Sequence, residues 1–75
     1  MQVFKEKDKY LVPTYWYDGD RGWKYISFNV FNENYDLVAC WGIREDKIDT
    51  LVLASSQETR DLERRWMLRI KHMQI

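Results

Sequence analysis

Seven aromatic side chains lie between Tyr15 and Phe31, on both sides of a single turn of glycine and aspartate at positions 18–22. Aromatic and β-branched residues favour strands, and Gly and Asp favour tight turns, so this stretch predicts a β-hairpin. One face of a small sheet cannot bury so many rings. The sequence therefore predicts a sheet in which a second face is also aromatic.

Four runs rich in Tyr, Trp, Phe, Val and Ile predict four strands, at about 10–17, 23–31, 35–43 and 48–53. The connections between these runs are short, which favours an antiparallel four-stranded β-meander. Pro13 cannot donate a hydrogen bond to a neighbouring strand, so the first of the four strands is expected at an edge. Residues 2–5 are candidates for a further short strand.

A helix is predicted at about 56–73. Ser55 and Glu58 have the spacing of a capping box, and no Gly or Pro interrupts the chain from there to Met73. One face of this helix is apolar, formed by Leu62, Trp66, Ile70 and Met73. The 75 residues thus predict a single small α+β domain, 1–75, with one C-terminal α-helix packed on one face of the sheet.

The strand pairing predicts which face the helix covers. With a turn near Glu33–Asn34, Val30 is expected opposite Leu37, Phe28 opposite Ala39 and Ile26 opposite Trp41, and this side is the expected seat of the helix. The other side would remain uncovered, and we expect it to form a protein-binding or dimer face of Trp16, Trp23, Tyr25, Phe31 and Val38. A one-residue bulge would locally exchange the two faces.

The sequence lacks the residue patterns of the common catalytic and metal sites. Asp18 and Asp20 are spaced like the start of a calcium loop, but Gly22 and Trp23 occupy the fifth and sixth positions, where such a loop needs an oxygen ligand and a glycine. Cys40 is the only cysteine, in a predicted strand, and we expect a buried thiol there rather than a nucleophile. We predict no enzymatic activity, no metal and no cofactor.

Net charge is zero, with 12 Lys and Arg against 12 Asp and Glu, but the helix is basic. Arg60, Arg64 and Lys71 fall on one stripe of the predicted helix and are candidate contacts to nucleic-acid phosphates. The loops of the sheet are acidic, and a neutral chain attracts phosphates weakly over long distances. A nucleic-acid-binding accessory protein is therefore the alternative interpretation.

The function favoured by these patterns is a non-enzymatic protein-binding module that also self-associates as a homodimer. No apolar run approaches the length of a membrane span, the N-terminal residues lack the apolar core of a signal peptide, and a lone cysteine fits the cytoplasm. In size and aromatic surface the chain resembles small accessory proteins of phages and mobile elements that bind one host macromolecule stoichiometrically. This general resemblance implies a role as a stoichiometric inhibitor or accessory protein.

Overall fold

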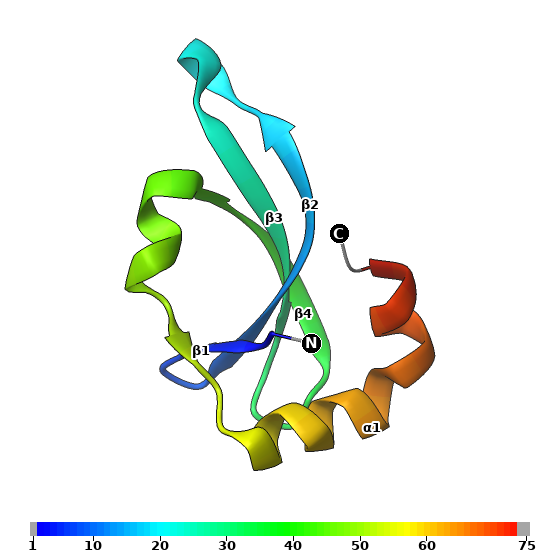
Figure 1. The fold of residues 1–75 in the computed structure, drawn as a ribbon. Coiled ribbons are helices and arrows are strands. Elements are labelled where there is room, and N and C mark those ends of the chain that lie inside the picture. Colours follow the sequence, from blue (N-terminus) through cyan, green and yellow to red (C-terminus); the bar gives the residue numbers. More distant parts are fainter. Residues whose placement is uncertain (1, 74–75) are drawn as a thin grey trace.

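The computed structural model describes residues 2–73, and their side chains as far as Trp66. Within these residues the fold is α+β, with a five-stranded antiparallel sheet and one helix (Figure 1). The strands are β1 (Phe4–Glu6), β2 (Lys9–Asp18), β3 (Lys24–Phe31), β4 (Leu37–Arg44) and β5 (Val52–Leu53), and the helix is α1 (Ser56–Met73). Two 3-10 turns, η1 (Asp20–Gly22) and η2 (Glu45–Thr50), interrupt the strands. The α+β class is confirmed, but the sheet has five strands rather than four, in the order β4-β3-β2-β1-β5.

The last predicted strand, 48–53, is mostly not a strand. Its first residues belong to η2, where the Thr50 hydroxyl donates to the Lys47 carbonyl at 2.6 Å and Leu51 N–H donates to the Ile48 carbonyl at 3.0 Å. Such local hydrogen bonds compete with strand pairing. Only β5 remains extended, and it pairs with β1, the short N-terminal strand that residues 2–5 suggested.

Pro13 does not place its strand at the edge of the sheet, so that prediction is wrong for β2 as a whole, which lies between β1 and β3. The physical argument holds locally, because the β1–β2 ladder covers only Lys9–Leu11 of β2 and does not reach Pro13. Pro13 also borders an irregularity of the ladder, a position that tolerates a missing N–H.

That irregularity is a one-residue bulge at Thr14. Pro13 pairs with Phe28 and Tyr15 pairs with Ser27, so Thr14 is an extra residue, and its hydroxyl donates to the Ser27 carbonyl at 2.9 Å. Residues beyond Thr14 therefore lie on the opposite face from that expected by simple alternation. We call the face of Phe28 the inner face and the face of Phe31 the outer face.

The inner face is covered by η2 and the residue that follows it, which lie to the left of the sheet in Figure 1. Ile48 and Leu51 pack there against a buried cluster. The cluster consists of Phe4, Leu11, Ile26, Phe28 and Val30. Burial of these side chains removes apolar surface from water and supplies one of the two cores of the fold.

The helix packs on the outer face, so its predicted seat on the inner face is wrong. Leu62 is fully buried there and Trp66 packs beside it. The sheet residues of this second core are Val3, Tyr10, Val12 and Phe31. The inner face was not open to the helix because η2 already covers it. The side chains of Ile70 and Met73 lie outside the described residues.

The β3–β4 register also differs from the prediction by two residues. The side chain of Asn32 accepts hydrogen bonds from the backbone N–H groups of Asn34, at 2.9 Å, and Asp36, at 3.0 Å, which widens the turn. A second irregularity follows at Val38. As a result Phe28 pairs with Trp41 rather than with Ala39.

The predicted capping box is present and also joins the helix to the sheet. Ser55 N–H donates to Glu58 Oε1 at 3.0 Å, and Glu58 N–H donates to Ser55 Oγ at 3.1 Å. Glu58 Oε2 further accepts from Lys5 Nζ and from Tyr10 Oη, each at 2.6 Å. The hydrogen bonds from Lys5 and then Tyr10 lower the pKa of Glu58 to about 2. One carboxylate therefore fixes the start of α1 against β1 and β2.

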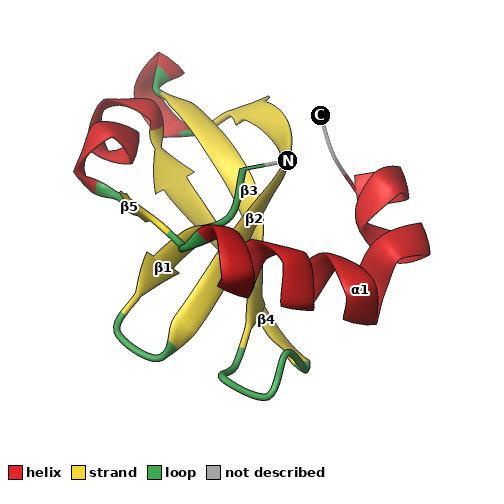
Figure 2. Ribbon diagram, turned by 60° about the horizontal axis from the view of Figure 1, so that its bottom comes forward, coloured by secondary structure: helices red, strands yellow, loops and turns green. Residues whose placement is uncertain are grey.

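The helix changes direction at Trp66, whose backbone leaves the helical region at φ −125° and ψ 17° (Figure 1). The indole ring lies 5.5 Å from the ring of Phe31, and Nε1 donates to the carbonyl of Tyr35. In the part of the chain that the structure describes, no helix combines the length and the apolar character that crossing a membrane requires. Viewed with its lower end forward, α1 runs across the strands rather than parallel to them (Figure 2).

Candidate functional site

The far end of the β2–β3 hairpin extends beyond both cores (Figure 1). The helix reaches only the near end of the outer face, where its residues contact Tyr10, Val12 and Phe31. Beyond that region the rings of the outer face are open to solvent. Tyr15 is 57%, Tyr17 38% and Trp23 44% exposed.

Tyr15, Tyr17 and Tyr25 form a row of neighbouring rings, of which the first pair is tilted by 52° and the second pair is stacked. The ring centroids of Tyr15 and Tyr17 are 5.9 Å apart, and those of Tyr17 and Tyr25 are 5.4 Å apart with an angle of 18° between the rings. Ring pairs at this spacing attract one another beyond the effect of burial. Each ring therefore restricts the positions open to its neighbour.

Two glycines make room for this row. A Cβ atom at Gly42 would lie 2.0 Å from Tyr17 Oη, and one at Gly19 would lie 2.1 Å from the ring of Tyr25. The rings therefore lie directly on backbone that carries no side chain. Gly42 belongs to β4, so Tyr17 reaches across the sheet from β2.

The row continues to an arginine that is itself held in place. The Arg44 guanidinium lies 4.1 Å from the centroid of the Trp23 ring, a cation–π distance. Asp46 accepts hydrogen bonds from Arg44 at 2.7 and 2.8 Å, and this pairing lowers the pKa of the Asp46 carboxyl. We call the surface formed by Tyr15, Tyr17, Trp23, Tyr25 and Arg44 the hairpin patch.

The structure brings together only two of the five residues predicted to form a binding face, Trp23 and Tyr25. Phe31 is fully buried beneath the helix, so its inclusion in an exposed face is corrected. Trp16 is 48% exposed but pairs with Ile26, which places it on the inner face. Val38 is 50% exposed on β4, at the second irregularity.

Sequence reasoning missed Tyr15, Tyr17 and Arg44. The bulge at Thr14 moves both tyrosines to the outer face and Trp16 away from it. Pro13 next to Thr14 was the available signal, because proline within a strand is confined to edges and bulges. Arg44 could not have been found in this way, because its contact with Trp23 depends on the β3–β4 register, which differs by two residues from the predicted one.

The structure describes two of the three side chains in the predicted basic stripe of the helix. Arg60 and Arg64 are exposed on α1, and the side chain of Lys71 lies outside the described residues. Acidic and amide groups lie close to both arginines: Arg64 approaches Asp61 at 3.7 Å, and Arg60 donates to Gln57 at 3.3 Å. These neighbours weaken the field that a phosphate would meet.

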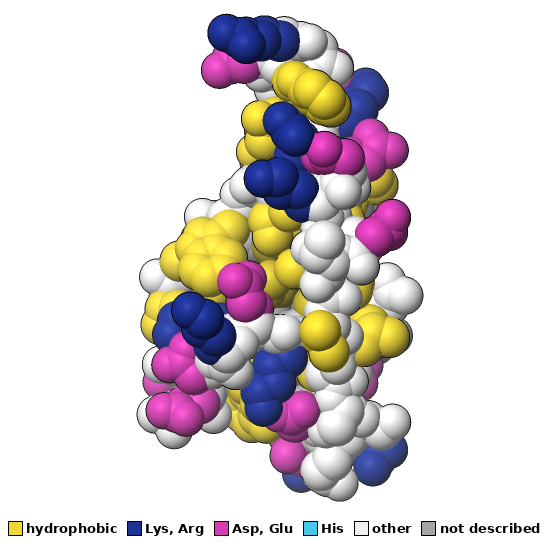
Figure 3. Space-filling model, turned by 90° about the vertical axis from the view of Figure 1, so that its left-hand side faces the viewer, with side chains coloured by type: hydrophobic (Ala, Val, Ile, Leu, Met, Phe, Trp, Pro, Cys, Tyr) yellow, Lys and Arg dark blue, Asp and Glu magenta, His cyan; other side chains and the backbone are white. Residues whose placement is uncertain are grey.

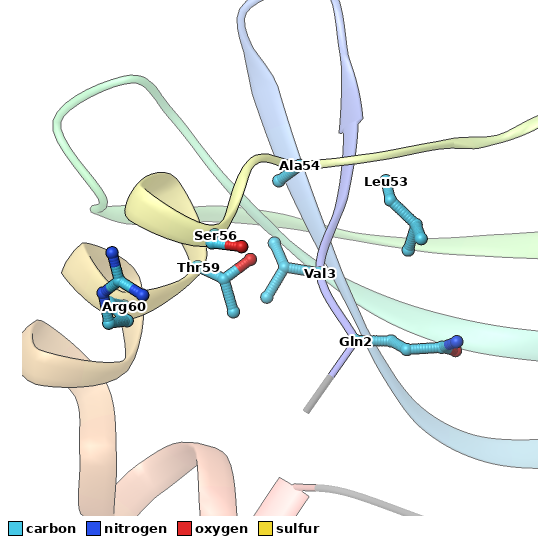
Figure 4. A pocket seen from close by; sticks show the side chains of 7 residues that line it. All are labelled: Gln2, Val3, Leu53, Ala54, Ser56, Thr59 and Arg60. Carbon is cyan, nitrogen blue, oxygen red and sulfur yellow. The ribbon is translucent and has the colours of Figure 1, made fainter.

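A shallow hollow of about 330 Å³ lies where the N-terminal segment and β5 meet the start of α1 (Figure 4). Ser56 and Thr59 face Val3 across it, and Arg60 is the one charged side chain among the described residues that line it. A single cation without a neighbouring acid or base does not provide general acid–base chemistry.

Cys40 is exposed rather than buried, contrary to the prediction. Its Sγ donates to Asn29 Oδ1 at 3.3 Å, so its neighbour is an amide and not an activating base. Among the side chains that the structure describes, which end at Trp66, no cluster of His, Cys, Asp and Glu has the geometry of a metal site.

The side of the molecule that carries η2 mixes apolar and charged side chains along its whole length (Figure 3).

Comparison of the chain with protein-family models, with curated proteins and with solved structures found no match.

Proposed function

We propose that this protein is a non-enzymatic protein-binding module and that the hairpin patch is its contact surface. The observation that supports this most directly is the exposure of several neighbouring aromatic rings at the far end of the β2–β3 hairpin. Tyr, Trp and Arg dominate the energetics of protein interfaces because they bury a large area and combine apolar and polar contacts. All five residues of the patch belong to these three types.

The arrangement of the patch favours binding in a second way. Side chains that must be ordered on association reduce affinity, by about 0.5–1.5 kcal/mol for each mobile side chain. Here the rings already stack on one another and on glycine backbone, and Asp46 holds Arg44. A partner would meet a surface that is largely in its bound conformation.

We further propose that binding is stoichiometric and cytoplasmic, as for an inhibitor or accessory protein. This rests on small size, on the hairpin patch and on the analogy with phage and mobile-element accessory proteins. This adds the stoichiometry and the cellular compartment to the first proposal and names no partner.

The test starts with affinity capture from the native host and mass-spectrometric identification of the captured protein. With that partner in hand, Trp23→Ala is expected to weaken the complex by about 2 kcal/mol or more, as for an interface hot spot. Trp16→Ala is the matched control, because Trp16 is 48% exposed against 44% for Trp23 but lies on the other face. Isothermal titration calorimetry compares the two, and a melting curve verifies that both variants fold. Equal losses of affinity in both variants would contradict the assignment of the hairpin patch.

The alternative, nucleic-acid binding by the basic helix, predicts a different result. Changing Arg60, Arg64 and Lys71 together to Glu would then abolish retention on DNA or RNA, and the affinity of the unchanged protein would fall steeply with salt. Under the proposal made here the triple variant retains its protein partner. Tight, salt-sensitive binding of the unchanged protein to nucleic acid would overturn the proposal.

A further inference from the structure

The two edges of the sheet differ greatly in length. One edge is β5, which has two residues, and the other is β4, which has eight. Among the described residues, nothing pairs with the side of β4 that faces away from β3. A free edge presents a row of backbone donors and acceptors to any extended chain.

The β4 edge has little of the usual protection against pairing. Proteins block such edges with proline, with charged side chains, with β-bulges, with short strands or with a covering element. From Leu37 to Ile43 there is neither a proline nor a charged residue. Along it Leu37 is 38%, Val38 50% and Trp41 36% exposed. Only the irregularity at Val38 interrupts an otherwise regular strand.

We infer that β4 pairs in antiparallel fashion with β4 of a second copy, which gives one continuous sheet across a homodimer. A second copy fits this edge because an antiparallel two-fold brings one neutral, apolar strand against another identical one. No charge within the strand opposes a like charge, since Arg44 stands at its end. Such an interface is isologous and closes at two copies.

The register follows from the bulge. Regular pairing is available only from Ala39 to Arg44, and directly opposed residues must lie on the same face of the joined sheet. A two-fold axis at Trp41 uses nearly all of this stretch. It places Trp41 opposite Trp41 of the second copy, Ala39 opposite Ile43 and Cys40 opposite Gly42.

A dimer of this kind carries two hairpin patches on one rigid sheet. Two linked sites can raise the apparent affinity for a partner that presents two copies of its own surface. The dimer is nevertheless independent of the proposed function, because it uses an edge and the patch uses an exposed face. A monomer that still loses its partner on Trp23→Ala would leave the proposed function intact and remove only the dimer.

Disulfide trapping tests the register. In the variant Cys40→Ser with Trp41→Cys, the new thiol is expected to face itself across the axis, at a Cα separation of about 4.5–5.5 Å that permits a disulfide. Mild oxidation should then give a covalent dimer on non-reducing gels. The matched control is Cys40→Ser with Val38→Cys, whose thiols would be about 20 Å apart in the same register and should stay unlinked. Equal cross-linking of both variants would overturn the register.

Sedimentation equilibrium tests the interface without a cross-link. The unchanged protein is expected to dimerise at micromolar concentration, and Trp41→Lys to weaken the dimer by about tenfold or more, because like charges then oppose each other at the axis. Trp16→Lys is the control and should leave the dimer unchanged, with circular dichroism confirming that both variants fold. A strictly monomeric unchanged protein, or a dimer that Trp41→Lys leaves intact, would overturn the inference.

Discussion

The two ends of the outer face of β2 and β3 are both aromatic, but one end is buried and the other is exposed to solvent. At the near end, Tyr10 and Phe31 are buried against Leu62 of the helix. At the far end, Tyr15 and Tyr17 point from the same face into solvent. Aromatic content therefore does not decide which rings form the core. The position of the covering element does.

The path of the chain and its hydrogen bonds explain why the helix reaches only the near end. The chain enters α1 directly from β5, which pairs with β1, and β1 pairs only with the first residues of β2. Glu58 then fixes the first turn of α1 through Lys5 and Tyr10. The helix α1 then changes direction at Trp66. The far end of the hairpin receives no such element among the described residues.

The largest expected difference between the two ends is in stability. Phe31→Ala should lower the free energy of unfolding by about 3–5 kcal/mol, because it leaves a cavity in a fully buried cluster. Tyr15→Ala, at the exposed end of the same face, should change it by about 0.5 kcal/mol or less. Urea denaturation of both variants measures the two values. Similar values would mean that the two ends are not covered differently.

The clamp at the near end should make stability depend on pH. The pKa of Glu58 is about 2 in the folded protein against 4.5 for an unperturbed Glu, so its contribution is fully present above about pH 5 and is lost as the pH falls toward 2. Glu58→Gln should remove this part of the acid dependence and cost about 1–3 kcal/mol at neutral pH. Denaturation across this pH range measures both effects.

Glu63→Gln, on the same helix, is the control for that experiment and should keep the acid dependence of the unchanged protein. Other carboxyls also have lowered pKa values, among them Asp8 and Asp46, so the difference between the two variants is the informative quantity. Identical pH profiles for Glu58→Gln and Glu63→Gln would show that the clamp contributes little.

A change beneath the hairpin patch should alter local structure more than stability. Gly42→Ala places a methyl group where Tyr17 Oη lies, so the exposed tyrosine must rotate away. The unfolding free energy should change by less than about 1 kcal/mol, because Tyr17 is already 38% exposed and its displaced ring can turn toward solvent. The near-ultraviolet circular dichroism of the tyrosines should change, and binding of a captured partner should weaken. An unaltered spectrum would mean that Tyr17 does not lie across Gly42 in solution.

Much of the local structure could be predicted from particular residues. Ser55 and Glu58 specified the start of the helix because a capping box is satisfied within one turn of the chain. The Gly- and Asp-rich turn specified the β2–β3 hairpin for the same reason. Prediction failed at Ile48, where extended and 3-10 conformations differ little in local preference and the hydrogen bond of Thr50 with Lys47 selected the turn.

The sequence alone determined the α+β class, the central hairpin, the helix and its cap, since each depends on residues that are close together in the chain. Tertiary structure alone decided which face the helix covers and which rings remain exposed. The bulge at Thr14 exchanged the faces of Tyr15 and Trp16, and η2 took the face predicted for the helix. A one-residue shift in a strand moves every following side chain to the other face. Pro13 shows that a bulge is permitted nearby, but whether the shift occurs depends on packing between distant segments.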